Sequence, residues 1–556
     1  MRAAWNYLLG LILISFFSTN NNNNAFAQHG AKYWVQFTDK TNSPFSINKP
    51  EEFLSSRAIQ RRQKNNIAIT AGDLPVSAIY QDSLSKIGVK VYYSSKWFNS
   101  VTIETNNDSL VETIKNLSFV KAVQKTADPL TYKKAVILDK NDLLFSEFSS
   151  TSDSNYYGNS YTQINLENGI ALHNLGFRGR GIIIAVIDAG FYQADQSSSL
   201  DTARQQGRIL GTRDFVDPGN NVYNANIHGA EVLSIIAGIQ PGTLVGTAPD
   251  ASFWLLRSED AESEYPVEED NWVPAAEMAD SAGADVINTS LGYSLFSDSV
   301  YNLTYTDLNG ETSRNSIAAN IAASKGIIVV VSAGNEGNTP WHYIGTPADA
   351  KNILTVGAIK SDRTIANFSS FGPTSDGRIK PDIAAFGVDA TVQSSPDNFG
   401  LVSGTSVSAP IISGLSACLV EAFPNETSSN IIMSIKMSSD RYTDPNDTFG
   451  YGIPDYLKVY NLLAAKTENV IKSVATYPNP FSDYLIFNLN FPLGETINIT
   501  CWNITGKKLF ELSRTFESIV YLSPELKVLE EGLYIFTFTG KSNKYFSKVI
   551  KRKFSN

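Results

Sequence analysis

The sequence predicts an α/β domain, built on a parallel sheet flanked by helices, with a smaller domain before it and another after it. Between Gly179 and Gly452, short and continuously apolar runs alternate with stretches of helical periodicity. Parallel strands that are covered by helices on both faces require such unbroken apolar runs. The runs are Ile182–Ile187, Phe253–Leu256, Val286–Ile287, Ile327–Val331 and Ile353–Val356, and the helical stretches are Ala230–Ala237, Pro274–Ser281 and Ser316–Ala323.

Length and composition exclude several classes of protein. The 556 residues suit about three or four domains at roughly 150 residues each. Apolar residues make up 42% and charged residues 18%, which supplies a sizeable core and excludes a largely disordered or coiled-coil chain. The net charge of −10 argues against a general binder of phosphate backbones, so no nucleic-acid partner is expected. The 2 cysteines and 4 histidines form no disulfide framework and no HExxH or CxxC pattern, so no zinc site is expected.

The first 27 residues have the features of an export signal. Arg2 supplies positive charge, residues 8–17 are apolar, and residues 25–27 form a small-x-small cleavage pattern. The apolar run, about ten residues, is short for a bilayer span; an uncleaved anchor is the alternative. No other stretch approaches 18 uninterrupted apolar residues, so we expect no membrane span in the mature form.

A small α+β domain is predicted over residues 32–123. The Arg61–Arg62 pair within it is expected on a solvated helix face, with a processing site as the alternative. Residues 126–157 lose periodicity and gain Ser, Asp and Lys, which predicts an exposed connector. The predicted strands are Tyr33–Phe37, Val89–Tyr93 and Ser100–Glu104, and the predicted helices are Pro50–Gln63 and Asp108–Leu117.

After Lys466 the sequence pattern changes to turn clusters and strand-like segments, which predict a small β-sandwich of about 80 residues. It begins with the turn cluster Tyr477-Pro478-Asn479-Pro480-Phe481. Strand-like segments follow at Tyr484–Asn488, Ile497–Trp502 and Leu533–Thr539, and Asn503–Gly506 is predicted as a hairpin turn.

Four polar residues of the central domain stand beside predicted strands or helices, and each has an ordinary alternative role. Asp188 leaves a buried strand and needs a strong partner to stay charged, although turn aspartates are common there. His228 opens a helical run, where a packed or surface histidine is the usual outcome. Asn335, in Ser-Ala-Gly-Asn-Glu-Gly, suits a tight turn. Ser406, in Gly-Thr-Ser-Val-Ser-Ala-Pro, suits a helix start.

Together these motifs and their order resemble the subtilisin-like serine peptidase (S8) family, whose triad runs Asp, His, Ser along the chain. The resemblance covers roughly residues 165–463. It implies that Asp188, His228 and Ser406 are catalytic and that the Asn335 side-chain amide stabilises the oxyanion. It implies a secreted serine endopeptidase that hydrolyses peptide bonds through an acyl-enzyme. No cofactor is required for this chemistry, and a structural calcium ion stays open.

The resemblance also suggests where substrate binds. The segment around Ser290, Leu291 and Gly292 resembles the segment of the family that pairs with an extended substrate peptide, which is thereby added as a strand. Gly334 precedes the oxyanion residue, and Gly345 falls at the floor of the pocket for the residue before the scissile bond. No acid is assigned to that pocket, so a large apolar or aromatic residue is expected there.

Several residues depart from the family pattern or leave alternatives open. Ala189 and Ala230 stand where hydroxyl residues are usual, and Glu231 stands where many members have His. We expect Glu231 to be a solvated helix residue, with tuning of local polarity as the alternative. The acidic segment 259–270 borders more distant subsites in the family. A preference for basic substrate residues, a solvated loop and a calcium site all remain open for it.

The flanking regions have their own resemblances. Residues 28–125 resemble the family's ferredoxin-like propeptide, a chaperone and temporary inhibitor, followed by a linker over 126–160 and the peptidase domain over 161–465. Residues 470–556 resemble a bacterial type IX secretion sorting domain, which implies an extracellular or surface location. The implied partners are protein or peptide substrates, the chain's own propeptide and the type IX secretion machinery. A catalytically idle surface adhesin or binding scaffold, and an esterase, are the rival functions.

Overall fold

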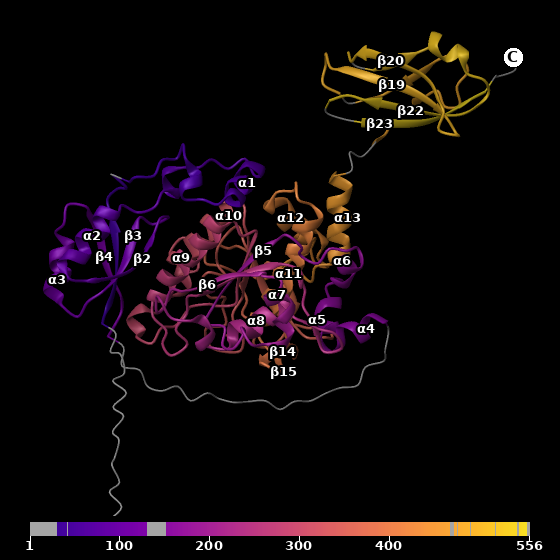
Figure 1. Cartoon of the computed structure of the whole chain (residues 1–556). Coiled ribbons are helices and arrows are strands. Elements are labelled where there is room, and N and C mark those ends of the chain that lie inside the picture. Colours follow the sequence, from indigo (N-terminus) through magenta and orange to yellow (C-terminus); the bar gives the residue numbers. More distant parts are fainter. Residues whose placement is uncertain are drawn as a thin grey trace, which may run out of the picture.

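The structure, a computed structural model, describes residues 30–552 except 42, 130–151, 468–471, 475, 490, 518, 542 and 543. The described residues form three domains, over 30–129, 152–467 and 472–552 (Figure 1). The predicted export signal and most of the predicted connector lie outside them. The end of that connector differs from the expectation, because Tyr157 and Ser160 are buried and helical turns begin at Ser152.

A seven-stranded parallel sheet forms the centre of the second domain, in the spatial order β13-β12-β11-β10-β5-β9-β6. All five predicted apolar runs are strands of this sheet. Two further strands were not predicted: β6 is an edge strand whose only buried residue is Asp214, and β13 has two alanines at its centre, a residue that is depleted from strands. The strands are β5 (Ile183–Asp188), β6 (Ile209–Asp214), β9 (Ser252–Arg257), β10 (Val286–Thr289), β11 (Ile328–Ser332), β12 (Leu354–Ile359) and β13 (Ile383–Phe386).

Helices cover both faces of the sheet because successive side chains of each buried strand point to opposite sides. Ile184 and Val186 of β5 belong to the core with α8 (His228–Ala237) and α11 (Thr405–Ala422). Ala185 and Ile187 belong to the core with α9 (Val267–Ala282) and α10 (Arg314–Ser324). The other α-helices of this domain are α4 (Ser152–Tyr157), α5 (Tyr161–Asn165), α6 (Ile170–Asn174), α7 (Asp201–Gln205), α12 (Ser428–Ser438) and α13 (Tyr456–Thr467).

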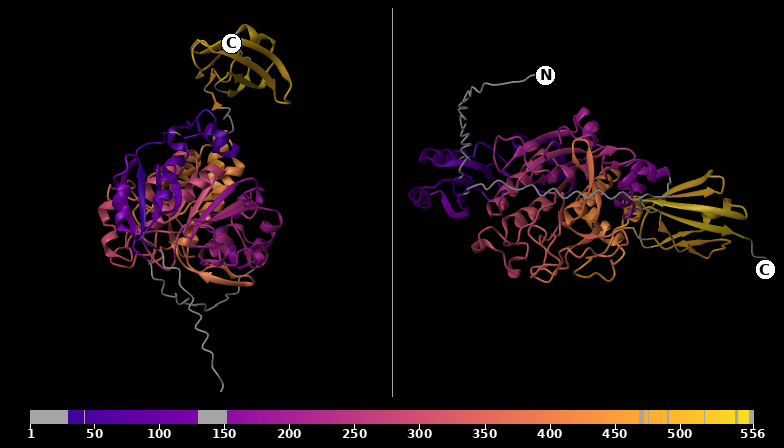
Figure 2. Two further views of the ribbon diagram at one scale, coloured as in Figure 1. Left: turned by 60° about the vertical axis from the view of Figure 1, so that its left-hand side comes forward. Right: turned by 90° about the horizontal axis from the view of Figure 1, so that it is seen from below.

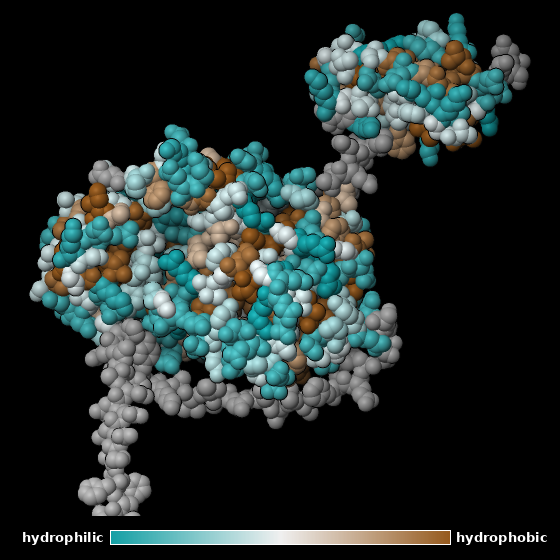
Figure 3. Space-filling view, viewed as in Figure 1, coloured by the Kyte–Doolittle hydropathy of each residue, from teal (hydrophilic) through white to brown (hydrophobic). Residues whose placement is uncertain are grey.

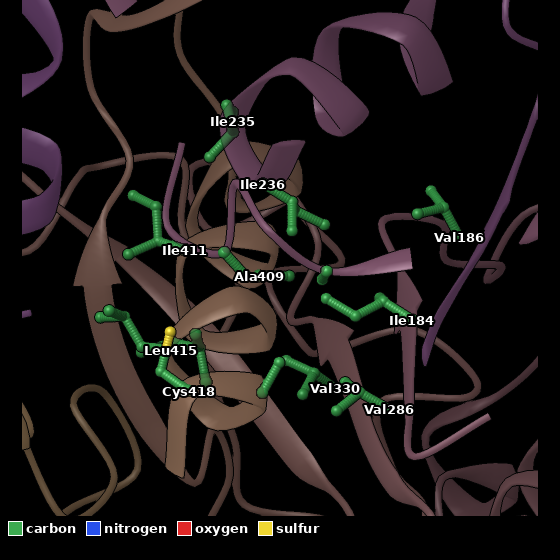
Figure 4. Packing of buried hydrophobic residues seen from close by; sticks show 14 of the residues in the cluster. Ile184, Val186, Ile235, Ile236, Val286, Val330, Ala409, Ile411, Leu415 and Cys418 are labelled. Carbon is green, nitrogen blue, oxygen red and sulfur yellow. The ribbon is translucent and has the colours of Figure 1, made fainter. Parts of the chain in front are cut away.

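The core helix of the domain is α11. Its Ile411, Leu415 and Cys418 belong to the same buried cluster as Val286 and Val330 of the sheet (Figure 4). Within the described part of the chain, α11 is the helix whose length and composition would allow it to cross a membrane. Because 89% of it is buried inside the domain, it serves as a core helix.

The first domain is an antiparallel sheet in the order β2-β3-β1-β4 with two helices packed on it. Its β-α-β-β-α-β succession is the ferredoxin-like arrangement that the resemblance implied. The predicted helix over 50–63 is divided, because the Ser55 side chain accepts a hydrogen bond from Ala58 N–H and starts a new helix. The elements are β1 (Lys32–Phe37), α1 (Ser56–Lys64), α2 (Ala78–Ile87), β2 (Lys90–Ser95), β3 (Ser100–Glu104), α3 (Asp108–Lys115) and β4 (Val120–Ala127).

This domain packs along α9 and α10 of the second domain (Figures 1 and 2). The expectation that Arg61 and Arg62 form a solvated helix face was wrong. Their side chains are only 5% and 1% exposed, and both pair with Asp280 of α9. A pair of arginines looks solvent-facing in sequence, because the carboxylate that buries it lies 219 residues away.

The third domain is a β-sandwich of a five-stranded sheet, β16-β23-β22-β19-β20, and a three-stranded sheet, β17-β18-β21. Phe487, Phe536 and Phe538 fill the space between the sheets, while hydrophilic residues cover much of the surface in Figure 3. The predicted turn over 503–506 joins β19 and β20. The strands are β16 (Lys472–Ser473), β17 (Thr476–Tyr477), β18 (Leu485–Phe487), β19 (Thr496–Asn503), β20 (Lys508–Thr515), β21 (Val520–Leu522), β22 (Gly532–Thr539) and β23 (Lys544–Lys551).

Candidate active site

Asp188 and His228 are joined at the carboxyl end of β5. His228 Nδ1 lies 2.7 Å from Asp188 Oδ1, which also accepts the Ala189 N–H at 2.8 Å. Asp188 is fully buried, whereas 31% of the His228 side chain is exposed. Gly229 permits this approach, because a Cβ there would stand 2.8 Å from Asp188 Cβ. A buried carboxylate thus sets the orientation of a half-exposed imidazole.

Ser406 is the second residue of α11 and is held over the end of β10. Its backbone carbonyl accepts a hydrogen bond from Ser290 Oγ at 2.8 Å. Ser290 Oγ in turn accepts one from Asn288 Nδ2 at 3.2 Å, and Ser413 Oγ donates to Asn288 Oδ1 at 2.8 Å. Ser406 and Ser413 of α11 are therefore connected to β10 and to the residue that follows it. Because Ser406 is in the first turn of α11, it lies near a helix N-terminus, which favours negative charge.

Asn335 reaches the same place from the end of β11. Its Oδ1 accepts hydrogen bonds from the Thr405 N–H at 2.9 Å and from Thr405 Oγ1 at 3.1 Å. Since the carbonyl side of the amide is occupied, Nδ2 is left to donate elsewhere. Asn335 Nδ2 and Ser406 Oγ stand 3.4 and 2.9 Å from the point that a Cβ on Gly404 would occupy. The amide donor and the hydroxyl therefore border one small space.

The structure gathers the four predicted residues at one edge of the sheet, with Asp188, Ser406 and Asn335 over the neighbouring strands β5, β10 and β11. Among the described residues, no hydrogen bond joins His228 Nε2 to Ser406 Oγ. Catalytic hydrogen bonds are often long in unliganded enzymes and tighten with substrate. The arrangement can support nucleophilic attack by a hydroxyl with an adjacent base and an oxyanion donor.

The predicted substrate-binding residues lie beside this group. Ser290 and Leu291 are nearly buried after β10. Beyond Gly292, Tyr293 and Thr346 each donate a backbone N–H to the other's carbonyl at 2.9 Å. A Cβ on Gly345 would stand 3.0 Å from the Tyr293 carbonyl. Gly334, with φ +108°, donates its N–H to Thr405 Oγ1 at 3.0 Å. All five predicted positions therefore converge on one region.

Carboxyl groups surround the imidazole. Partial burial opposes its positive charge, but Asp188, and then Glu259 and Glu231, raise the pKa of His228 to about 9. Burial raises the pKa of Glu231 and of Glu259 to about 7 each. Glu231 is half-buried rather than solvated as expected. The alternative reading, tuning of local polarity, is the one that its effect on His228 supports.

The acidic segment 259–270 is not a solvated loop as a whole. Glu268, Glu269 and Asp270 lie in the first turn of α9 and are 0%, 5% and 4% exposed. Glu269 accepts the Arg314 N–H at 3.1 Å, and Asp270 pairs with the Arg314 guanidinium. Over residues 30–129, 152–467 and the described part of 472–552, no cluster of three or more His, Cys, Asp or Glu is arranged to hold a metal ion.

Comparison with known proteins shows which family this arrangement is found in. The model of the subtilase family (peptidase S8) matches residues 179–452, which contain all four residues of the site. This part of the chain is a subtilase domain. Subtilisin NAT of Bacillus subtilis subsp. natto is 28% identical over 265 residues, which cover 47% of this chain and 61% of that protein. The chain therefore spans about three fifths of the length of this relative.

Two further proteins are similar to parts of this chain. The thermophilic serine proteinase of Bacillus sp. (strain AK1) is 27% identical over 339 residues, or 61% of this chain and 76% of that protein. A crystal structure of MycP1 with its N-terminal propeptide removed is 25% identical, covers 54% of this chain and 97% of that chain, and superposes with a TM-score of 0.42.

The flanking domains also match family models. Residues 32–141 match the peptidase S8 propeptide domain of Bacteroidota, and residues 475–552 match the secretion system C-terminal sorting domain. The chain therefore carries a propeptide and a type IX secretion signal, and its location is extracellular or at the cell surface.

Sequence reasoning overlooked two positioning residues of the subtilase domain. Thr405 was treated only as part of a motif, yet it holds both Asn335 and Gly334. Asn288 lies two residues before Ser290 of the predicted peptide-binding segment, and its side chain links Ser290 to Ser413. The position of Thr405 directly before Ser406 is the sequence feature that could have indicated its role. No local pattern indicated that Asn288 and Ser413, 125 residues apart, are partners.

Proposed function

We propose that the chain is a secreted serine endopeptidase that hydrolyses peptide bonds through an acyl-enzyme. The observation that carries this proposal is the placement of Ser406 over β10, between the Asp188–His228 pair at β5 and the Asn335 amide at β11. The subtilase match over residues 179–452 supports the same activity.

The first step is attack by Ser406 Oγ on the carbonyl carbon of the scissile bond. A serine hydroxyl is a weak nucleophile, so a neighbouring base must take its proton. His228 Nε2 is the free imidazole nitrogen, because Nδ1 faces Asp188. It accepts the proton from Oγ, and the Asp188 carboxylate stabilises the imidazolium that forms.

The carbonyl oxygen becomes an oxyanion during this attack. Asn335 Nδ2 and the backbone N–H of Ser406, at the start of α11, are the donors that meet it. The imidazolium then returns its proton to the leaving amine, which releases the first product and leaves an ester on Ser406. Water, deprotonated by His228, attacks this ester and regenerates the hydroxyl.

The substrate chain is held as an added strand along residues 290–292, where main-chain groups give affinity and side-chain pockets give specificity. Gly345 lies behind the residue that precedes the scissile bond. Because no acidic residue is assigned to that pocket, we infer that it takes a large apolar or aromatic side chain.

The propeptide domain acts as a temporary inhibitor that the enzyme removes. Residues in fixed contacts flank the cleavage position on both sides. Ala127 pairs with Lys32 at the end of β4, and Tyr157 Oη forms a hydrogen bond of 2.7 Å with His173 Nδ1. Since these contacts hold the chain on both sides, we place the cut between Ala127 and Tyr157.

Comparison of the wild type with Ser406→Ala and Ser403→Ala tests the proposal. Ser403 is an exposed serine three residues earlier and serves as the matched control. The wild type and Ser403→Ala should react with a fluorophosphonate, cleave a peptide amide and show an N-terminus between Ala127 and Tyr157. Ser406→Ala should do none of these. Normal maturation of Ser406→Ala would contradict self-cleavage, unreactive wild type would favour an idle scaffold, and ester turnover without amide turnover would favour an esterase.

A further inference from the structure

A group of buried charges lies where the propeptide domain meets the C-terminal ends of α9 and α10. Asp280 of α9 is fully buried and contacts three cations of the propeptide domain. Arg61 Nη2 lies 2.6 Å from its Oδ1, and Arg62 Nη2 and Lys96 Nζ lie 2.8 and 3.2 Å from its Oδ2. Although burial opposes its charge, Lys96, Arg61 and Arg62 lower the pKa of Asp280 to about 2.

The ends of the two helices complete a site for a guanidinium group. Arg61 donates to three backbone carbonyls: Nη2 to Asp280 O at 3.0 Å, Nη1 to Ala284 O at 2.6 Å and Nε to Lys325 O at 3.1 Å. Carbonyls at helix C-termini lack partners within the helix and carry partial negative charge. A planar fork of five N–H donors matches such a set of acceptors, whereas a lysine ammonium does not.

The acceptors all belong to the subtilase domain, at the ends of α9 and α10. Gly283 and Gly326, with φ +89° and +85°, end α9 and α10 in the left-handed conformation. A Cβ on Gly326 would stand 2.7 Å from the Asn65 side chain, and one on Gly283 would stand 2.5 Å from Arg57 Cβ. These glycines form a shallow seat into which the propeptide segment fits.

The site lies at the opposite edge of the sheet from the catalytic residues. The chain after α9 enters the amino end of β10, and the chain after α10 enters that of β11. Asp188, Ser290 and Asn335 follow the carboxyl ends of strands. The 6 residues of β5 separate the two edges by about 20 Å at roughly 3.3 Å per residue. A ligand can therefore occupy these helix ends while the active site stays open.

Release of the propeptide leaves Asp280 without Arg61, Arg62 and Lys96. A carboxylate and several carbonyls without partners are costly unless a donor or water replaces what was lost. We propose that the uncovered ends of α9 and α10 are an arginine-binding exosite, at which protein substrates dock through two consecutive arginines on a helix. This inference rests on the proposed function, because it requires that the propeptide is removed.

The propeptide segment defines the chemistry of the partner. Arg61 and Arg62 are adjacent residues of α1, and the guanidinium group of each contacts the Asp280 carboxylate. Lys325, on the subtilase side, pairs with Asp73 of the propeptide domain at 3.0 Å. A partner with an arginine pair and a nearby carboxylate therefore reproduces the whole set of contacts, and a polybasic segment alone reproduces less of it.

Two versions of one helical reporter protein test the exosite. They share a flexible cleavable tail and differ only in an Arg-Arg or a Gln-Gln pair on an exposed helix. For the mature wild-type enzyme, kcat/KM should be about tenfold or more higher for the Arg-Arg reporter, since loss of a buried charge pair costs at least that factor. Asp280→Asn should abolish the preference, and Asp362→Asn, at an exposed acid elsewhere, should keep it.

A short peptide amide separates this inference from the proposed function. All matured enzymes should cleave it equally, because it cannot reach the helix ends. Equal kcat/KM for both reporters with normal cleavage of the short peptide would overturn the exosite alone. A preference that survives in Asp280→Asn would overturn it as well. If Asp280→Asn does not mature, the two reporters with wild-type enzyme decide the matter. No cleavage of any substrate would overturn the proposed function, and the exosite for substrates with it.

Discussion

Asn335 Oδ1 accepts a hydrogen bond of 2.9 Å from the backbone N–H of Thr405, the residue that precedes Ser406. The end of β11 is thereby joined directly to the first turn of α11. The contact also determines which side of the amide faces Ser406, because the carbonyl oxygen is already occupied. A single side chain thus links the oxyanion donor to the nucleophile.

Loss of this link should lower turnover and leave binding intact. In Thr405→Val the hydroxyl contacts with Asn335 and Gly334 disappear while the backbone contact remains, so we expect kcat to fall about tenfold with little change in KM. In Asn335→Ala the donor itself is lost, and a fall of about 10²–10³ is expected, a range that comes from a subtilisin. Steady-state kinetics on a peptide amide measures both. A rise in KM at constant kcat would contradict the assignment.

The activity should rise with pH to an unusually high midpoint. His228 accepts a proton only when it is neutral, and the surrounding carboxylates raise its pKa to about 9. We therefore expect kcat/KM to be low near pH 7 and to increase through about pH 9 in the free enzyme. A pH profile on a short peptide amide measures this midpoint. A plateau already reached at pH 7 would show that the neighbouring carboxyl groups do not act on the imidazole.

Glu231 should contribute to that midpoint without taking part in the reaction. It stands one helical turn after His228 and raises the pKa of the imidazole. Removal of its charge in Glu231→Gln should move the rise of kcat/KM toward lower pH and leave the plateau value unchanged. Glu426→Gln, at a half-buried carboxylate beyond α11 that accepts a hydrogen bond from Asn430, is the matched control and should leave the midpoint in place. A lower plateau in Glu231→Gln would indicate a structural role.

Arg62 should be essential for the affinity of the propeptide. Its guanidinium contacts Asp280 and Asp73, and all three side chains are almost fully buried. In Arg62→Ala both carboxylates lose a partner, which costs about 3–5 kcal/mol, or a factor of about 10² or more in the inhibition constant of the cleaved propeptide. Lys115→Ala removes a pair between exposed side chains and should change it by less than about 1 kcal/mol. Equal effects would show that the buried charges do not hold the propeptide.

Much of the architecture was predictable from local patterns. The runs that became β5, β9, β10, β11 and β12 are continuously apolar, because strands covered on both faces have no solvent side. Prediction failed where burial came from distant contacts. The strand β6 is too exposed to stand out. The acids of residues 268–270 look solvated in sequence but are buried in α9, where Glu269 and Asp270 contact Arg314.

The order and chemistry of the motifs around Asp188, His228, Asn335 and Ser406 are properties of the sequence alone, since each depends on residues within a few positions. The sequence could not say which side chains hold those groups in place, or that Arg61 and Arg62 end on a carboxylate of another domain. Those outcomes depend on burial, hydrogen bonding and charge pairing between segments that are 70 to 219 residues apart in the chain. Only the folded chain brings such segments within hydrogen-bonding distance.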